Sequence, residues 1–236
     1  MTLGILFTTL GYLTGIAVLV WAAKERKLLT EGMMRIGAAA FLGGIVGAKL
    51  TEWIFSGWPF RIHPWLILDP SLGGKSLLGG IVIGWGCAEI AKRRLGIRRS
   101  TGDLFALALP AGEAVGRIGC FFNGCCYGTA TSGPIAIYQH DAWRHPTQLY
   151  SALVALTIFV LLCAFRKRML REGDLFRLYL VLFGITRFGL EFIREQTDYV
   201  WGLSAMQWFC MELFLAGLIG LALSPRNVHI QAEPST

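Results

Sequence analysis

Residues 103–128 read DLFALALPAGEAVGRIGCFFNGCCYG, an apolar stretch with a single arginine, Arg117, in its second half. About twenty apolar residues are enough to cross the hydrocarbon core of a bilayer as a helix. A charged side chain is costly in that core, so an arginine there is expected to face a partner or a polar cavity. The glycines that follow permit close packing and sharp turns. The stretch therefore predicts a membrane-spanning helix that ends in a functional loop.

The rest of the chain has the same apolar character. Its 236 residues are 54% hydrophobic and only 16% charged, and the mean hydropathy is +0.55. Soluble domains have about 25% charged residues, so this balance excludes a soluble enzyme, a disordered protein and a small disulfide-stapled secreted domain. The apolar blocks predict an all-α integral membrane protein with seven transmembrane helices, at Leu3–Ala23, Ile36–Phe55, Ser76–Ala91, Asp103–Phe122, Thr147–Phe165, Leu175–Ile193 and Ser204–Leu223.

Basic residues are concentrated in alternate connections between these blocks. Most of the 22 Lys and Arg residues follow the first, third and fifth blocks, at residues 24–35, 92–99 and 166–177. Cytoplasmic loops carry the excess of Lys and Arg in membrane proteins. The pattern predicts an outside N-terminus and a cytoplasmic C-terminus, and it accounts for the net charge of +7 without nucleic-acid binding. We expect one membrane domain over residues 1–225 and a short cytoplasmic tail over residues 226–236.

Three basic residues, Lys49, Arg117 and Arg187, lie inside the predicted spans. Glu191 is four residues after Arg187, and hence on the same helix face. The predicted direction of the spans puts these arginines in the middle or outer half of the bilayer. Because the planar guanidinium suits phosphate, they predict a site for the phosphate of an anionic lipid. Structural ion pairs that clamp the helices are the alternative.

A further polar segment, RHPTQLY at residues 144–150, precedes the fifth apolar block. Pro146 suits the first turn of a helix. His145 is placed where a general acid or base would meet a lipid headgroup. A lone histidine at an interface also serves as a capping or hydrogen-bonding residue, and that interpretation stays open.

Together these segments resemble the prolipoprotein diacylglyceryl transferase family. The family signature G-R-I-x-N-F-x-N-G-E-x-x-G is matched from Gly116 to Gly128, at Arg117, Ile118, Phe121, Asn123, Gly124 and Gly128 among others. H-P-[ST]-Q-L-Y-E is matched from His145 to Ser151 except at its last position, and R-F-x-x-E-F-x-R from Arg187 to Arg194 without a change. Residues 202–207 and Gly11-Tyr12 resemble the family's entry into the last span and its first-span pattern. The resemblance runs over most of the chain.

The resemblance implies a transferase of the bacterial cytoplasmic (inner) membrane that works without a cofactor. Its donor would be phosphatidylglycerol, and its acceptor the thiol of a lipobox cysteine in a secreted precursor, or a related small molecule. By matching position, Arg117 and Arg187 would hold the phosphate, Glu191 would orient Arg187, and His145 would shape the outer mouth. The same matching assigns lipid contacts to Tyr12, Gly79, Gly80, Cys120, Asn123, Gly124, Gly128, Gln148, Tyr150 and Arg194.

Three positions depart from the family pattern. Leu78 stands where the family has a histidine before a Gly-Gly, and Cys120 and Cys125 replace an asparagine and a glutamate. A changed acceptor, a changed donor or lost activity would each explain these departures. A non-catalytic lipid-binding scaffold and a thiol-redox membrane protein are therefore the competing hypotheses.

Cys120, Cys125 and Cys126 allow four interpretations. A disulfide from Cys120 to one of the other two is favoured, because the outer face is oxidising. A nucleophilic thiol near Arg117 is the second, and we take Cys125 as this candidate catalytic residue. A metal site with His140 or His145 is the third, but the spacing matches no standard zinc pattern. The fourth is inert packing. We expect no bound metal.

Overall fold

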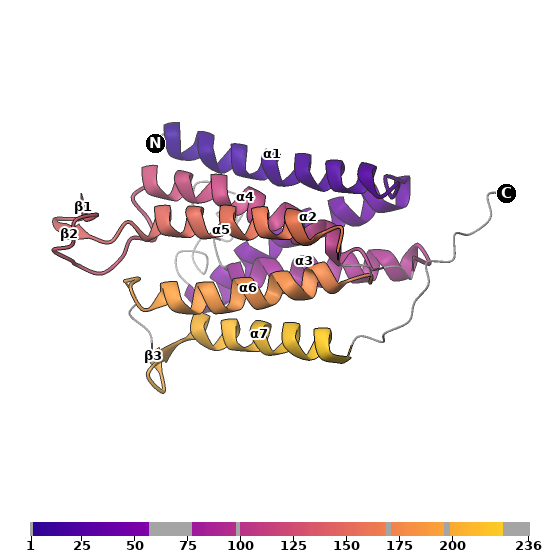
Figure 1. Cartoon of the computed structure of the whole chain (residues 1–236). Coiled ribbons are helices and arrows are strands. Elements are labelled where there is room, and N and C mark those ends of the chain that lie inside the picture. Colours follow the sequence, from indigo (N-terminus) through magenta and orange to yellow (C-terminus); the bar gives the residue numbers. More distant parts are fainter. Residues whose placement is uncertain (1, 57–76, 98–99, 169–170, 196–198, 224–236) are drawn as a thin grey trace. The chain divides into compact units, whose positions relative to one another are not determined.

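The computed structural model describes residues 2–56, 77–97, 100–168, 171–195 and 199–223. These residues form seven α-helices and two small hairpins (Figure 1). The helices are α1 (Thr2–Glu25), α2 (Glu31–Ser56), α3 (Leu77–Arg94), α4 (Gly102–Phe122), α5 (Thr147–Phe165), α6 (Asp174–Glu191) and α7 (Ala205–Leu223). The strands are β1 (Ile137–Gln139), β2 (Ala142–Arg144), β3 (Tyr199–Val200) and β4 (Leu203–Ser204).

Each predicted apolar block overlaps most of one of these helices, so the all-α prediction is confirmed. Five of them, α1, α2, α4, α5 and α7, are long and apolar enough to cross a membrane. The other two, α3 and α6, have 18 residues each, and four of these are charged in each helix. Ser76, at the start of the third block, and the predicted tail at 226–236 lie outside the described residues.

The chain divides into two compact units. The smaller unit, Lys24–Arg99, contains α2 and α3 packed antiparallel. Small residues allow this packing: a Cβ on Gly47 would lie 2.5 Å from the carbonyl oxygen of Gly79. Such close backbone approach is typical of helix pairs in membranes. The predicted lipid contacts Gly79 and Gly80 thus lie where α3 packs on α2.

The larger unit comprises Met1–Ala23 and Ser100–Thr236, and it contains α1 and α4 to α7. A Cβ on Gly11 would lie 2.9 Å from the carbonyl oxygen of Gly112, so the backbones of α1 and α4 touch. At the start of α4, the buried carboxylate of Asp103 accepts hydrogen bonds from the backbone N–H groups of Gly173 (3.1 Å) and Phe176 (3.2 Å). These bonds cap α6, because the first N–H groups of a helix have no partner within it.

The opposite end of α6 meets the loop that follows α4. The N–H of Thr129 donates to the carbonyl of Ile193 (2.9 Å), and the N–H of Gly128 donates to the carbonyl of His145 (3.0 Å). A Cβ on Gly128 would lie 2.6 Å from the carbonyl oxygen of Ile193, so only glycine fits between the backbone segments at Ile193 and His145. The three segments singled out in the sequence therefore meet at one end of the larger unit (Figure 1).

The two hairpins were not predicted, because their strands are only two or three residues long. β1 and β2 pair antiparallel, and the turn between them places His140 and Asp141 at φ of 50° and 60°. β3 and β4 pair around Trp201 and Gly202, at φ of 53° and 79°. Positive φ at both turn residues suits tight hairpins. Both hairpins lie at the end of the larger unit where the three segments meet.

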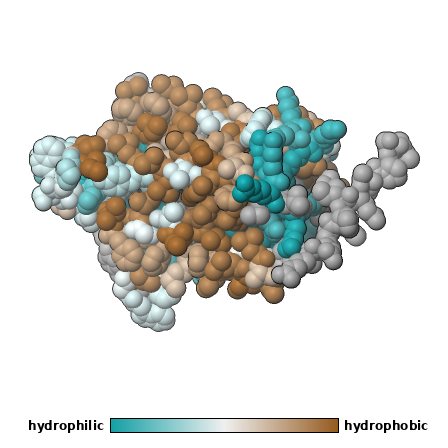
Figure 2. Space-filling view, in the orientation of Figure 1, coloured by the Kyte–Doolittle hydropathy of each residue, from teal (hydrophilic) through white to brown (hydrophobic). Residues whose placement is uncertain are grey.

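The helices of the larger unit present apolar side chains to the outside. Figure 2 shows hydrophobic residues along the helices and paler, more polar residues at the β1–β2 hairpin. Large exposed side chains include Leu6 on α1, Leu153 on α5, Ile185 on α6 and Ile219 on α7, each at least half exposed. Contiguous apolar surface of this kind marks contact with lipid or protein. Together with five helices of spanning length, it supports a multi-pass membrane protein.

Candidate active site

The arginine of the opening stretch is paired within its own helix. Arg117 donates from Nε (3.0 Å) and Nη2 (2.8 Å) to the same Oε1 of Glu113, one turn earlier on α4. The two side chains are only 13% and 20% exposed. Buried charges need a partner, and this fork-shaped contact fixes the direction of the guanidinium.

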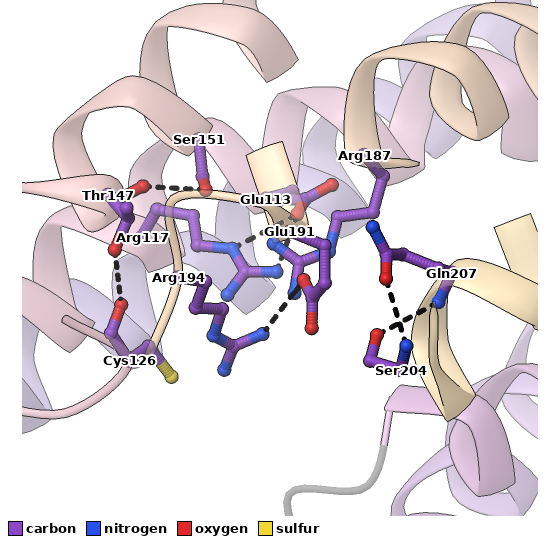
Figure 3. A network of polar contacts seen from close by, with 10 residues as sticks. All are labelled: Glu113, Arg117, Cys126, Thr147, Ser151, Arg187, Glu191, Arg194, Ser204 and Gln207. Carbon is purple, nitrogen blue, oxygen red and sulfur yellow. Dashed lines mark hydrogen bonds and ion pairs between the residues drawn. The ribbon is translucent and has the colours of Figure 1, made fainter. Parts of the chain in front are cut away.

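The pair on α6 is buried more deeply. Nη2 of Arg187 lies 2.9 Å from Oε2 of Glu191, and the two side chains are 5% and 1% exposed. Nη1 of Arg194, just after the helix, lies 3.6 Å from the same oxygen. Figure 3 shows Arg187, Glu191 and Arg194 beside Arg117 and Glu113. The predicted convergence of Arg117, Arg187, Glu191 and Arg194 is thus seen in the structure.

Several buried polar atoms in this region are left without a hydrogen bond among the described residues. They include Nε of Arg187, Oε1 of Gln148 and Nε2 of Gln207. An unsatisfied buried donor or acceptor costs about 1–3 kcal/mol, so a group of them at one place indicates a missing ligand or water. A narrow cavity between α4, α5 and α6 reaches the same region, and it is lined by Glu113, Ser151, Ile158, Phe183, Thr186 and Arg187 among others.

The start of α5 holds the loop that follows α4. Oγ1 of Thr147 donates to the carbonyl of Cys126 (2.7 Å), and Nε2 of Gln148 donates to the carbonyl of Cys125 (2.9 Å). Oγ of Ser151 donates back to the carbonyl of Thr147 (2.7 Å). Gln148 is 1% exposed. Its amide nitrogen therefore positions the loop, and its unpaired Oε1 is what remains for a lipid contact.

His145 lies beside this loop with its ring next to a tyrosine. Its Nδ1 is 3.5 Å from the hydroxyl of Tyr150, at the limit of a hydrogen bond. Its backbone N–H donates to the carbonyl of Thr129 (3.1 Å). Arg144 lies over the ring of Tyr127 and donates to Glu195 (3.0 Å). The segment thus lies beside the loop that follows α4, and its role at the outer mouth of the site stays a prediction.

The sulfur atoms of Cys120, Cys125 and Cys126 converge. All three lie within 4.8 Å of one another, and none is bridged in the structure. Cys126 adopts a φ of 62°, which an L-residue rarely does. Hydrogen bonds from the thiols of Cys120 and Cys125, and the charges of Arg194 and Arg117, lower the pKa of Cys126 below its usual range. The cluster therefore lies within electrostatic reach of the arginines.

The remaining predicted lipid contacts are spread more widely. Asn123 ends α4, and its side chain occupies the space beside Gly4 of α1. Gly124 follows at a φ of 65°, and its carbonyl oxygen lies 2.6 Å from Nε2 of His140. Tyr12 is 52% exposed on α1. Leu78 belongs to α3, but its side chain lies outside the described part of the structure.

The sequence of this chain matches one known protein family. The family model described as prolipoprotein diacylglyceryl transferase matches residues 3–223. This range contains all three segments that meet at the site. The chain belongs to the prolipoprotein diacylglyceryl transferase family. The resemblance inferred from the motifs is therefore confirmed.

Curated relatives in this family cover most of the chain. A protein of Finegoldia magna is 34% identical over 92% of this chain and 88% of its own length. One of Campylobacter lari is 30% identical over 88% and 83%, and one of Campylobacter curvus is 34% identical over 79% and 75%. All three are named phosphatidylglycerol–prolipoprotein diacylglyceryl transferase. The chain is thus similar to these transferases along three quarters or more of their length.

Two residues of this transferase-family site were not among the predicted contacts. Glu113 lies four residues before Arg117, and this i,i+4 spacing is the sequence signal for the pair that forms. Gln207 forms a capping box with Ser204: the N–H of Ser204 donates to Oε1 of Gln207 (2.9 Å), and the N–H of Gln207 donates to Oγ of Ser204 (3.1 Å). The S-x-x-Q spacing before an apolar helix is the sequence signal for such a cap.

Proposed function

We propose that this chain moves the diacylglyceryl group of phosphatidylglycerol to the thiol of a lipobox cysteine in a prolipoprotein. The acceptor sulfur forms a bond to the terminal glyceryl carbon, and the bond from that carbon to the phosphate oxygen breaks. The leaving glycerol phosphate keeps the electron pair, and the thiol gives up its proton. The names of the curated relatives give phosphatidylglycerol as the donor and prolipoprotein as the acceptor.

The single observation that carries the proposal is the cluster of buried charges. Among the described residues, Arg117, Arg187 and Arg194 form ion pairs with two carboxylates, Glu113 and Glu191. This leaves one surplus positive charge, which matches the single negative charge of a phosphodiester. A guanidinium stabilises the charge that develops on a leaving phosphate because it is already oriented before the reaction. We assign this role to Arg117 and Arg187, with Glu191 orienting Arg187.

The side chains around the cavity, and not its volume, support a lipid substrate, because the space of about 10 Å³ holds no more than a water molecule. Its lining combines apolar side chains, such as Ile158 and Phe183, with the charged groups of Glu113 and Arg187. A diacylglycerol phosphate has the same division between apolar chains and an anionic head. The unpaired Nε of Arg187 and Oε1 of Gln148 offer a donor and an acceptor to that head. His145 and Tyr150 would then contact the incoming acceptor at the rim.

The charge distribution of the loops supports a position in the cytoplasmic membrane. We propose that residues 1–225 form one membrane domain with all seven helices spanning, and that the N-terminus lies outside and the C-terminus in the cytoplasm. The basic connections 24–35, 92–99 and 166–177 would lie on the cytoplasmic side. The site, at the other end of α6, would then face the outer leaflet, where secreted precursors arrive.

The test is a transfer assay with the purified full chain in nanodiscs that contain phosphatidylglycerol. A lipobox peptide is added, and mass spectrometry measures the gain of a diacylglyceryl group while a coupled assay measures released glycerol phosphate. We expect both products in equal amounts. Lipid that co-purifies and is never consumed would instead indicate a lipid-binding scaffold.

Arg117→Ala and Arg35→Ala form a matched pair for this assay. Both arginines contact a glutamate four residues earlier, but the Arg35–Glu31 pair is 63% and 75% exposed. We expect Arg117→Ala to lower turnover by about 10²–10³-fold, and Arg35→Ala to leave turnover unchanged. Equal turnover in the two variants would remove Arg117 from the mechanism.

A further inference from the structure

The loop after α4 folds so that three thiols point to one place. Cys120 comes from the last turn of α4, and Cys125 and Cys126 come from the loop that turns back on it. The N–H of Cys125 donates to the carbonyl of Cys120 (3.2 Å), and the Cys125 thiol approaches the same oxygen at 3.7 Å. Three sulfurs within 4.8 Å of one another form the group that, among the described residues, is suited to holding a metal ion.

Side chains of α5 hold this loop in place through its backbone carbonyl groups and not through its sulfur atoms. The carbonyl groups of Cys125 and Cys126 are bound by Gln148 and Thr147 on α5. Cys126 is held at a positive φ, a conformation that costs a non-glycine residue about 1 kcal/mol or more. Ligand side chains that are positioned by a surrounding set of hydrogen bonds are typical of metal sites. The thiols are thus pre-arranged, and their backbone is fixed from the opposite side.

The spacing suits zinc. A zinc–sulfur bond is about 2.3 Å, so sulfurs in a tetrahedral site lie about 3.8 Å apart. The observed upper limit of 4.8 Å requires a contraction of about 1 Å at most. Three thiolates around Zn²⁺ have a net charge of −1, so the nearby cations Arg117 and Arg194 stabilise the loaded site. Three protein ligands leave the fourth position open, as in catalytic zinc sites.

We propose that Cys120, Cys125 and Cys126 bind a zinc ion, and that its open fourth position takes the thiol of the acceptor cysteine. This proposal rests on the proposed transferase function. A coordinated thiol is deprotonated outright, so the acceptor loses its proton to solvent when it binds the ion. The thiolate then attacks the glyceryl carbon, and the phosphate leaves toward the arginines. Zinc thereby supplies the thiolate in a chain whose third span has leucine in place of the family's histidine.

The position of the cluster relative to the arginines fits this role. Gly128, two residues after Cys126, forms a β-bridge with Arg194. In Figure 3 the sulfur of Cys126 points to the side on which Arg194 and Glu191 lie. An acceptor sulfur on the metal would therefore meet a lipid whose phosphate is held by Arg117 and Arg187.

Cobalt binding by the purified full chain is the primary test, because Co²⁺ replaces Zn²⁺ and is coloured. The chain is stripped with a chelator under reducing conditions and titrated with Co²⁺ in detergent. We expect about one ion per chain with thiolate-to-cobalt charge-transfer bands and the visible bands of a tetrahedral site. Adding Zn²⁺ should remove the colour. Absence of the charge-transfer bands would overturn the proposal.

Serine variants identify the ligands. We expect Cys120→Ser, Cys125→Ser and Cys126→Ser each to lose the three-thiolate spectrum and to weaken zinc binding at least tenfold in a competition assay. Cys163→Ser on α5, outside the cluster, is the matched control and should bind as the unchanged chain does. Identical spectra in the control and the three variants would place the metal elsewhere and overturn the proposal.

Metal binding and transfer are read separately, so the two proposals fail independently. Cobalt binding through three thiolates without any transfer would contradict the proposed function and leave the metal site standing. Full transfer by a chain shown to be free of metal would support the function and overturn the zinc proposal. A disulfide between two of the three cysteines in protein isolated without reductant, with no metal bound, would also overturn it. Loss of transfer on chelation and its return with Zn²⁺ would support both.

Discussion

Helix α6 carries an arginine–carboxylate pair near each end, and the two pairs differ in their surroundings. Near its start, Nη1 of Arg177 lies 2.6 Å from Asp174, and 31% of the arginine side chain is exposed. Near its end, Arg187 and Glu191 lie 2.9 Å apart and are 5% and 1% exposed. Asp174 itself is only 10% exposed, so this pair is partly screened by solvent through its arginine and contributes about 1 kcal/mol or less to stability. A buried pair often costs more in desolvation than it returns, so its presence calls for a different explanation.

The hydrogen bonds around the two pairs supply that explanation. At the start of α6, the carboxylate of Asp103 accepts from the N–H groups of Gly173 and Phe176, which satisfies the helix end within the chain. At the other end, Nε of Arg187 and Nε2 of Gln207 are buried without a partner among the described residues. Satisfied polar groups hold the fold together. Unsatisfied ones in a buried place indicate a ligand.

The largest expected difference between the two ends is in catalysis. Arg187→Ala removes a buried cation that faces the leaving phosphate, and we expect turnover to fall by about 10³-fold. Arg177→Ala removes the equivalent group at the start of the same helix and should change turnover less than about twofold. The transfer assay in nanodiscs measures both. Similar losses in the two variants would contradict a division of α6 into a structural end and a catalytic end.

A smaller difference is expected when the carboxylates are neutralised. Glu191→Gln keeps the shape of the side chain but removes the charge that orients Arg187 and Arg194, and we expect turnover to fall by about 10–100-fold. Asp174→Asn should leave turnover unchanged. The donor concentration is varied so that turnover and the Michaelis constant are separated. A rise in the Michaelis constant alone would mean that Glu191 affects lipid binding but does not position the clamp.

Much of the fold and the charged part of the site could be predicted from the sequence. The apolar blocks predicted the helices, because length and hydropathy are properties of each segment alone. The spacing of Arg187 and Glu191 gave a shared helix face for the same reason. Their placement with Arg117 followed from the predicted direction of the spans, which puts all three in the middle or outer half of the bilayer. The burial of the pair was expected from the cost of placing charge in an apolar span.

Features that depend on the backbone path of the loops could not be predicted. The convergence of the three sulfurs requires the positive φ of Cys126, which its residue type does not suggest. The role of Gln148 as a holder of the Cys125 carbonyl depends on where the loop runs. The hairpin turn at His140 and Asp141 lacks the Asn-Gly or Asp-Gly pair that would signal it. Each of these outcomes is decided by tertiary contacts.

The structural end of α6 can be tested through stability. Asp103→Ala leaves the buried N–H groups of Gly173 and Phe176 without their acceptor, and we expect the free energy of unfolding to fall by about 1–3 kcal/mol. Turnover per folded molecule should stay the same. Denaturant unfolding in detergent, followed by tryptophan fluorescence, measures the first, and the transfer assay the second. A loss of turnover with unchanged stability would show that this end of α6 also takes part in the reaction.

The smallest expected effect is at the capping box of α7, where structure and site share one residue. Ser204→Ala removes the hydroxyl that accepts from the N–H of Gln207, and we expect a loss of about 1 kcal/mol in the free energy of unfolding. Turnover should fall slightly as well, because losing this half of the capping box loosens the start of α7 that carries Gln207, although the N–H of Ser204 still donates to the Gln207 side chain. Ser132→Ala, at an exposed loop position, is the control and should change neither quantity. If Ser204→Ala lowers stability but leaves the Michaelis constant and turnover untouched, Gln207 belongs with Asp103 among the residues that only hold the helices.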